Sequence, residues 1–173
     1  MADYRTGFGY DVHALADGLP LMLGGVRIES PFGCVAHSDG DAAIHALCDA
    51  LLGALSLGDI GKHFPDTSEE FRGMDSKILL GRTMSLIEER GWKVVNADIV
   101  IILQKPKLAG YIPSMCAVLG ESMRISPDRV SVKATTTEHL GFTGRSEGCA
   151  ACATVLLKRK TFLCGFFGNL FKK

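Results

Sequence analysis

The chain reads Ser38-Asp39-Gly40-Asp41 at the start of a long apolar segment, and this stretch predicts the beginning of a helix. Short polar side chains at a helix start accept hydrogen bonds from backbone amides that have no partner inside the helix. The apolar residues that follow recur at helical spacing and would form one face: Ile44, Leu47, Leu51 and Leu55. We expect this helix to run to about Leu57.

Two β-rich segments precede this helix. Arg5–Leu15 predicts one strand, and Leu21–Ile28 predicts a second strand in which Gly24-Gly25 gives a bulge or a bend. Between this second strand and the helix, Ser30–Gly33 is expected to be a loop.

After the helix, a polar loop is expected at Gly58–Asp66, and a glycine-rich loop at Leu140–Gly148. The expected helices are Ser76–Arg90, which ends before Gly91, and Tyr111–Met123; the expected strands are Val94–Leu103, Val130–Thr136 and Cys149–Leu157. The order β-β-α-α-β-α-β-β predicts an α+β domain in which helices pack on one face of a mixed sheet. We expect self-association to cover the other face.

Composition narrows the class of protein. The 173 residues are 47% hydrophobic and 22% charged, as in an ordinary globular domain. Lys+Arg and Asp+Glu are equal at 19 each, so no basic surplus points to nucleic acid as the main ligand. Neither a signal peptide nor an apolar run of roughly 18–20 residues is present, and we expect a cytoplasmic protein.

Six cysteines are too sparse for a disulfide scaffold and are expected to be reduced. Cys149 and Cys152 have the spacing of a redox or zinc pair. They fall on a predicted strand, where residues three apart point to opposite faces, so we interpret them as two small buried residues.

The residues with metal-binding chemistry are Asp11, His13 and His45. Asp11 and His13 are two apart on a predicted strand and project from the same face. One carboxylate and two imidazoles suit zinc, and three protein ligands leave the open position typical of a catalytic site. These residue types also occur together by chance, and His45 taken alone is equally compatible with a hydrogen-bonded core histidine.

Two further segments suit phosphate. The helix start at His37–Asp41 offers free amides to an anion, although Asp39 and Asp41 would have to face away from it. Lys133–Glu138 offers hydroxyls, a Lys and a carboxylate suited to magnesium held jointly with phosphate, but a Thr-rich edge strand explains the same residues. Walker, dinucleotide-binding and G-x-S-x-G motifs are absent from the sequence.

Taken in order, these motifs resemble the 2-C-methyl-D-erythritol 2,4-cyclodiphosphate synthase family. The motifs are Gly9–His13, Ala36–Asp41 with His45, Gly58–Gly61, Phe64–Thr67, Lys133–Glu138 and Leu140–Arg145. The resemblance covers about Thr6 to Lys160. It implies a single synthase domain over residues 1–160, followed by an apolar C-terminal tail of unknown role over residues 161–173.

The resemblance implies a phosphorus–oxygen lyase of the non-mevalonate isoprenoid pathway. In its substrate, 4-diphosphocytidyl-2-C-methyl-D-erythritol 2-phosphate, the 2-phosphate attacks the β-phosphorus of the cytidine diphosphate group and releases CMP. The resemblance also implies a homotrimer in which the sheets meet around the axis and active sites lie between adjacent subunits.

The resemblance further implies roles for individual residues. Zinc is held by Asp11, His13 and His45; Mg²⁺ or Mn²⁺ is held by Glu138 with substrate phosphates; and the transition state is stabilised by His37 and Thr136. Other substrate contacts are expected from Ser38, Asp59, Gly61, Phe64 and Asp66. The cytidine pocket on the neighbouring subunit is expected from the segment Leu103–Ala109, in particular Leu103, Lys107, Leu108 and Ala109, and from Ala134, Thr135, Thr136 and Thr137. Phe142 and Arg145 would line a central cavity that in this family can hold an isoprenoid diphosphate.

Three features depart from the family pattern. His63 stands where an apolar residue is more common and is expected to be surface variation. His139 follows Glu138 where Lys is common and is expected to be exposed. The tail over residues 161–173 holds four of the nine Phe residues and is expected to lie on a membrane surface, pack on the trimer or be disordered.

Two other functions fit part of the pattern. A trimeric sensor of a phosphometabolite would keep the metal residues but would not need His37, Thr136 and Glu138. A metal-dependent phosphohydrolase would release free phosphate in place of CMP.

Overall fold

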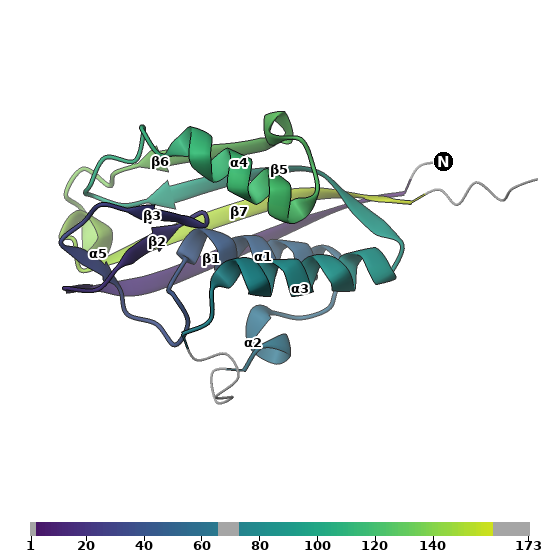
Figure 1. The fold of residues 1–173 in the computed structure, drawn as a ribbon, viewed down its shortest axis with the longest axis horizontal. Helices are drawn as coiled ribbons and strands as arrows, with labels where there is room; N and C mark the ends of the chain where they lie inside the picture. Colours follow the sequence, from purple (N-terminus) through teal and green to yellow (C-terminus); the bar gives the residue numbers. More distant parts are fainter. Residues whose placement is uncertain (1–2, 66–72, 161–173) are drawn as a thin grey trace, which may run out of the picture.

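The computed structural model describes residues 3–65 and 73–160 and has one main mixed sheet (Figure 1). Its strands, in spatial order, are β4 (Phe32–Cys34), β1 (Tyr4–Asp17), β7 (Gly148–Arg159), β5 (Trp92–Ile102) and β6 (Val130–Thr135). β5 and β6 are parallel, and the other neighbouring pairs are antiparallel. A separate hairpin is formed by β2 (Leu21–Leu23) and β3 (Val26–Ile28).

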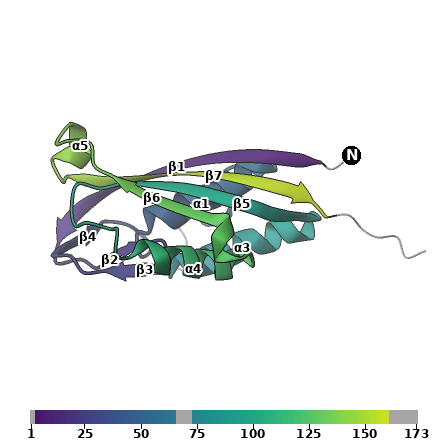
Figure 2. The same ribbon diagram turned by 90° about the horizontal axis from the view of Figure 1, so that it is seen from above.

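The three long helices lie on one face of this sheet (Figure 2). They are α1 (Ala42–Ala54), α3 (Ser76–Glu89) and α4 (Ile112–Met123); the short elements are α2 (Ile60–His63), the 3₁₀ helix η2 (Pro127–Arg129) and α5 (Gly141–Gly144). The core fills the layer between sheet and helices, with Ile44 of α1 and Ile99 and Ile101 of β5 fully buried. The predicted α+β class with helices on one face of a mixed sheet is confirmed.

Two glycines of β1 let α1 lie directly on the sheet. A Cβ atom at Gly7 would stand 1.8 Å from the Ala50 carbonyl oxygen, and one at Gly9 would stand 2.0 Å from the Ala46 carbonyl oxygen. Any side chain at either position would therefore force helix and strand apart. The next two inward-facing residues of the same strand are Asp11 and His13, so this close approach brings them within reach of His45 on α1.

The start of α1 is held by Asp41. Its carboxylate accepts hydrogen bonds from the backbone amides of Ile44 at 3.0 Å, Gly24 at 2.9 Å and Gly25 at 2.6 Å. Asp41 is completely buried, and burial raises the pKa of its carboxyl group. The predicted helix cap is confirmed, and the same side chain also ties the helix to the β2–β3 turn.

Several predicted boundaries are wrong. Leu21–Ile28 is a hairpin of two strands, because Gly24 and Gly25 both adopt positive φ and close a two-residue turn. The expected loop Ser30–Gly33 runs into β4, which pairs with the end of β1. α1 ends at Ala54, with Leu55 as C-cap, before the expected Leu57. The expected loops Gly58–Asp66 and Leu140–Gly148 contain α2 and α5.

The sheet face opposite the long helices carries exposed apolar side chains. Phe8, Tyr10 and Val12 of β1 are 64%, 49% and 44% exposed. Tyr10 pairs with Cys152 of β7, which pairs in turn with Val100 of β5, so the apolar surface extends across three strands. None of the three long helices covers it (Figure 2), which agrees with the expectation of self-association without testing it.

The two cysteines with metal-like spacing lie on opposite faces of β7. Cys149 pairs with the inward-facing His13 and is fully buried, whereas Cys152 pairs with the outward-facing Tyr10 and is half-buried. The prediction that Cys149 and Cys152 do not share a metal is supported by this geometry; that both are buried is wrong for Cys152. Among residues 3–65 and 73–160, no helix has the length and apolar character of a membrane span.

Candidate metal centre and substrate pockets

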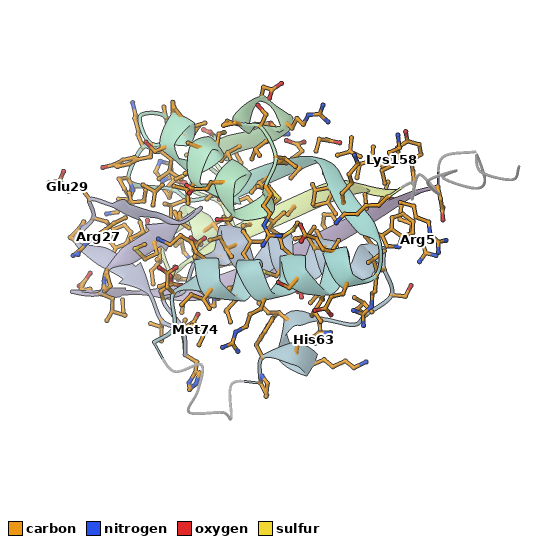
Figure 3. The ribbon with its side chains drawn as sticks, turned by 45° about the vertical axis from the view of Figure 1, so that its right-hand side comes forward. Arg5, Arg27, Glu29, His63, Met74 and Lys158 are labelled. Carbon is orange, nitrogen blue, oxygen red and sulfur yellow. The ribbon has the colours of Figure 1, made fainter. Side chains whose placement is uncertain are left out.

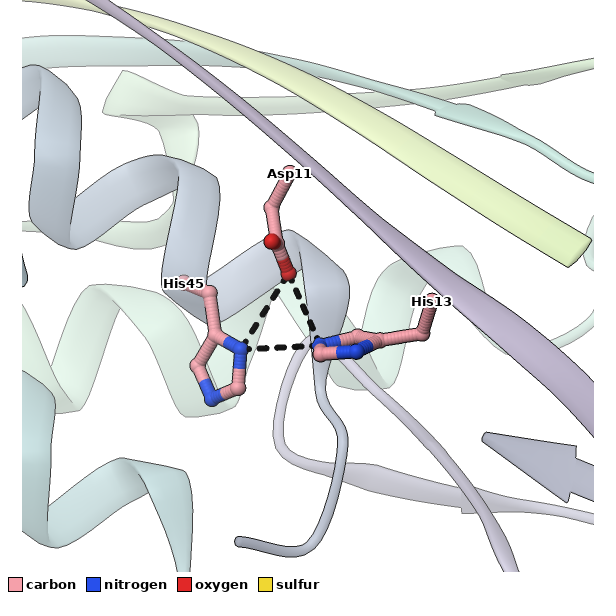
Figure 4. A group of neighbouring side chains, drawn as sticks. All are labelled: Asp11, His13 and His45. Atoms are coloured by element: carbon pink, nitrogen blue, oxygen red, sulfur yellow. Dashed lines mark hydrogen bonds and ion pairs between the residues drawn. The ribbon is translucent and has the colours of Figure 1, made fainter. Parts of the chain in front are cut away.

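Asp11, His13 and His45 come together as the sequence predicted (Figure 4). The Asp11 Oδ2 atom lies 2.9 Å from His13 Nε2 and 3.2 Å from His45 Nδ1, and these two nitrogens lie 3.0 Å apart. Three ligand atoms therefore converge on one point from two elements, β1 and α1. Within the described residues this is the one group of at least three His, Cys, Asp or Glu side chains placed to hold a metal ion.

The spacing of these atoms fits a tetrahedral ion. Zinc bonds of about 2.0–2.2 Å place tetrahedral ligand atoms roughly 3.3–3.5 Å apart, slightly more than the separations in this cluster. One carboxylate and two imidazoles are also the donor types that zinc accepts at catalytic sites. The residues present therefore fit the metal that the sequence suggested, and they leave its further coordination positions to other ligands.

The cluster is electrostatically prepared for a cation. Partial burial alone would raise the pKa of the Asp11 carboxyl, but hydrogen bonds and charge attraction from His13 and His45 hold that pKa well below its usual value. Burial alone would lower the pKa of His45, yet the neighbouring Asp11 carboxylate shifts it upward overall. Asp11 thus remains an anion that a bound cation can neutralise.

A cavity of about 320 Å³ opens beside the cluster. Of the residues with predicted roles, His37, Ser38 and Phe64 line it together with the three metal-ligand candidates; Val35, Ala36, Ile60 and Leu79 complete the wall. The last four residues were not predicted, because a buried apolar residue that contacts a ligand has the same pattern as one that only packs. The structure confirms that His37, Ser38 and Phe64 are neighbours of the metal cluster, while their roles stay predictions.

Asp39 and Asp41 face away from this cavity, as a phosphate cradle at the start of α1 would require. Asp41 bonds backbone amides of the β2–β3 turn, and Asp39 Oδ2 accepts a hydrogen bond from the Ser76 amide at 3.0 Å. Binding of an anion at this helix start stays a prediction.

Two other predicted contacts, Asp59 and Gly61, lie on the exposed α2 segment and do not line the cavity. Asp59 caps α2 by accepting a hydrogen bond from the Lys62 amide at 3.0 Å. Asp66 and the tail over residues 161–173 lie outside the described residues. The substrate contacts expected of Asp59, Gly61 and Asp66 stay predictions.

The two histidines that depart from the family pattern differ in burial. His63 is half-buried beneath α3 (Figure 3), and its Nε2 lies 3.1 Å from the Leu57 carbonyl oxygen. It therefore ties α2 to the segment after α1, and its interpretation as surface variation is wrong. His139 is exposed, as expected.

A second pocket, of about 220 Å³, lies between β5, β6 and the start of α4. It gathers most of the residues predicted for cytidine: Leu103, Lys107, Leu108, Ala109, Ala134, Thr135 and Thr136. Gln104 and Pro106 of the predicted segment Leu103–Ala109 also line it, Lys105 does not, and Ile112 is a lining residue that was not predicted. Thr137 does not, because its hydroxyl donates to the Leu140 carbonyl oxygen at 2.6 Å and meets the Thr143 hydroxyl at 2.9 Å.

Glu138 lies just beyond this second pocket. It is exposed, and its Oε1 accepts a hydrogen bond from the Thr136 hydroxyl at 2.8 Å. Glu138 and His139 both adopt positive φ, so the chain turns sharply there. The structure thus brings Thr136 and Glu138 together, and Glu138 is not part of the group formed by the other three metal-ligand candidates.

Phe142 and Arg145 lie on and directly after α5, which stands on the side of the sheet away from the long helices (Figure 2). Phe142 is 39% exposed. Arg145 forms a two-pronged ion pair with Glu147, with nitrogen–oxygen distances of 2.8 and 2.9 Å. Their expected place at a trimer cavity stays a prediction.

The metal cluster and the second pocket are far apart in one chain. Asp11 pairs with Ala151 of β7, Ala151 with Ile101 of β5, and Ile101 with Ala134 of β6. Three strand spacings therefore separate Asp11 from Ala134, or about 14 Å. The two pockets share no lining residue.

A three-ligand cluster beside a polar cavity is the arrangement of a metal-dependent enzyme. A family model described as the YgbB family matches residues 4–158, and the chain belongs to that family.

Relatives of this chain with assigned names show which enzymes belong to this family. A 2-C-methyl-D-erythritol 2,4-cyclodiphosphate synthase of Pseudomonas syringae pv. syringae is 57% identical over 155 residues, covering 90% of this chain and 99% of the relative. A solved structure of such a synthase in a CDP-bound form is 45% identical, with a TM-score of 0.82 over 88% of this chain and 99% of the other. The bifunctional IspDF of Campylobacter jejuni is 42% identical, with a TM-score of 0.89 over 92% of this chain and 43% of the other. The family resemblance noted from the motifs is confirmed.

Proposed function

We propose that this chain converts 4-diphosphocytidyl-2-C-methyl-D-erythritol 2-phosphate into 2-C-methyl-D-erythritol 2,4-cyclodiphosphate and CMP. An oxygen of the 2-phosphate forms a bond to the β-phosphorus, and the bond from that phosphorus to the oxygen shared with the α-phosphorus breaks. The electron pair leaves with CMP. The nucleophile belongs to the substrate, so the chain needs no nucleophilic Ser or Cys of its own.

The observation that carries this proposal is the Asp11–His13–His45 cluster, in a chain 57% identical to a named synthase over nearly its whole length. The CDP-bound relative adds a ligand with the cytidine diphosphate group that this reaction requires. The second pocket, with its apolar wall and its hydroxyls from Thr135 and Thr136, has the chemistry to accept a nucleobase and an adjoining phosphate.

In this proposal, zinc is held by Asp11, His13 and His45, and Mg²⁺ or Mn²⁺ by Glu138 with the substrate phosphates. Such ions supply Lewis-acid stabilisation of the charge on phosphate oxygens. His37 and Thr136 stabilise the transition state with hydrogen bonds, and Ser38 and Phe64 hold the methylerythritol part in the 320 Å³ cavity. Holding both phosphates in one site removes much of the entropic cost of their approach.

We further propose a homotrimer with active sites between subunits. The separation of the metal cluster from the second pocket, which Thr136 lines, supports it, because a neighbouring subunit can bring that pocket to the cluster. The exposed Phe8, Tyr10 and Val12 supply an apolar surface for sheets that meet around an axis. Phe142 and Arg145 would then line a central cavity able to bind an isoprenoid diphosphate.

The catalytic domain in this proposal is residues 1–160, since the family model ends at residue 158. The 161–173 tail is then a separate apolar segment. Deleting it and comparing sedimentation with liposomes tests the membrane option: unchanged partitioning after deletion would remove that option.

Phosphorus NMR of the cytidyl substrate incubated with the protein and divalent ions tests the reaction. We expect the signals of CMP and a cyclic diphosphate to appear together. Free phosphate without cyclic product would favour a phosphohydrolase, and bound but unchanged substrate would favour a sensor. The His37→Ala variant, with its metal cluster intact, is the control that should bind metal but turn over slowly.

A further inference from the structure

His45 uses its two ring nitrogens in different directions. Its Nδ1 faces Asp11 and His13, whereas its Nε2 lies 3.0 Å from the Ser76 hydroxyl and 3.1 Å from the Ser38 hydroxyl. An imidazole that gives the Nδ1 lone pair to a metal carries its proton on Nε2. That single proton has two hydroxyl oxygens within hydrogen-bonding distance.

The Ser76 hydroxyl is oriented to accept this proton. Ser76 is the first residue of α3 and is completely buried. Its hydroxyl donates to Asp39 Oδ1, and its backbone amide donates to Asp39 Oδ2 at 3.0 Å. Since the hydroxyl hydrogen is used on Asp39, the oxygen offers its lone pairs to His45.

Asp39 is itself held in place on the loop before α1. Its amide donates to the Met74 carbonyl oxygen at 3.2 Å, and its Oδ1 lies 3.3 Å from the Asp41 amide. Asp39 thus links the start of α1 to the start of α3 through backbone and side-chain bonds. A carboxylate so placed polarises the Ser76 hydroxyl toward His45.

The Ser38 hydroxyl has a different environment. Ser38 is half-buried and lines the 320 Å³ cavity, and its oxygen lies 3.3 Å from the Gly40 amide. Among the described residues, the side-chain partners of the Ser38 hydroxyl are the His45 ring and the Gly40 amide, and neither is a carboxylate that would orient its hydrogen. Its hydroxyl can therefore turn toward a ligand in the cavity.

We propose that Ser76, oriented by Asp39, is a positioning residue that fixes the tautomer and ring orientation of His45 for metal binding and leaves the Ser38 hydroxyl to the substrate. This inference deepens the metal site of the proposed function and rests on it. Hydrogen-bond partners of this kind behind a ligating histidine typically change metal affinity by about 10- to 100-fold.

Zinc affinity of the purified full chain, measured by competition with a chromophoric chelator, tests the inference without substrate. Ser76→Ala removes the acceptor but keeps the backbone bond to Asp39, and we expect zinc to bind about 10- to 100-fold more weakly. Asp39→Asn should weaken zinc binding in the same direction. Ser85→Ala is the matched control, since Ser85 lies exposed on the same helix and bonds only its own helix backbone at Gly81.

Three further variants separate positioning from a structural role. Ser76→Thr keeps the hydroxyl and should retain more zinc affinity than the equally large Ser76→Val. Ser38→Ala should bind zinc as the wild type does, and its KM for the cytidyl substrate should rise. Thermal unfolding of each metal-free variant identifies any variant that fails to fold. If Ser76→Thr or Ser76→Val fails to fold, the zinc affinities of Ser76→Ala and Asp39→Asn decide whether the inference holds.

Equal zinc affinity in wild type, Ser76→Ala and Asp39→Asn would overturn the inference and leave the proposed function intact. A loss in Ser38→Ala as large as that in Ser76→Ala would also overturn it. A wild-type chain that binds no zinc would overturn the proposed metal site, and the inference with it.

Discussion

The metal cluster and the segment from Thr136 to Glu138 differ in how completely one chain builds them. His45 is 8% exposed, its ring nitrogens have partners on both sides, and the glycines of β1 set the distance between its helix and its strand. Thr136 and Glu138 are exposed at the far edge of the same sheet and mainly bond each other. The three metal-ligand candidates are thus preorganised by buried contacts of one chain, whereas Thr136 and Glu138 are exposed to solvent.

This contrast indicates which part of the proposed site one chain can build by itself. Metal binding requires ligand atoms within about 3.5 Å of one another, which only a rigid interior provides. In the homotrimer that we propose, a neighbouring subunit would supply the residues that lie about 14 Å from the cluster within one chain. Substitutions in one region at a time therefore separate what each region does alone from what the two do together.

The largest effect should come from removing a metal ligand. His13→Ala should abolish zinc binding and reduce kcat by about a thousandfold or more, because charge on the phosphates loses its main stabilisation. Glu138→Gln should reduce kcat by about a hundredfold while zinc affinity stays unchanged. Chelator competition and steady-state CMP release measure the two quantities. Loss of zinc in Glu138→Gln would mean that the two regions are not independent.

Mixing two inactive variants sharpens the comparison further. If each active site takes its metal cluster from one subunit and Thr136 from the next, His13→Ala and Thr136→Val chains should complement each other. In randomly assembled trimers, about a quarter of the sites would combine an intact cluster with an intact Thr136. Coexpressed and copurified mixed trimers should show activity near that fraction. Activity no higher than that of either variant alone would place both regions of the site in one subunit.

The same contrast explains which features of the two regions the sequence could predict. Asp11, His13 and His45 could be found because strand period, helix spacing and ligand chemistry all point to one cluster. Ser76 was recognised only as a helix start, since its contact with His45 depends on how α3 packs against α1. The sequence predicts one strand in place of the hairpin, because two adjacent glycines fit a bulge as well as a turn, and the hydrogen bonds from both glycines to Asp41 depend on the folded structure.

The boundary errors have a similar cause. β4 has only three residues and forms because it pairs with the end of β1, a long-range contact that local pattern does not contain. The long helices and central strands, whose burial pattern repeats over many residues, were predicted to within a few residues at each end.

A smaller effect is expected from a substitution at the contact between β1 and α1, which holds the cluster together. Gly9→Ala would place a Cβ atom 2.0 Å from the Ala46 carbonyl oxygen, so helix and strand must separate. We expect a loss of about 3 kcal/mol in the free energy of unfolding and weaker zinc binding. Gly53→Ala is the control on α1, since its Cβ would meet nothing closer than 3.9 Å and it should stabilise the helix by about 0.5–1 kcal/mol. Urea unfolding of both metal-free variants measures the difference, and equal stabilities would show that the close approach is dispensable.

The smallest effect is the pH dependence that the Asp11 carboxylate gives to the metal cluster, because it outweighs the effect of burial on the pKa of His45. Asp11 raises the pKa of His45 above its ordinary value near 6.5, so in the metal-free protein a proton occupies the ring up to a higher pH than in a free histidine. Zinc must displace that proton, and its affinity should therefore fall as pH falls through the raised pKa, by up to about tenfold per pH unit for one proton released. Above that pKa the affinity should level off as far as His45 is concerned. Calorimetric titration in buffers of different ionisation enthalpy counts the protons released on binding. Release of no proton near pH 6.5 would show that His45 is already neutral there, and that the Asp11 carboxylate is balanced by something other than a protonated His45.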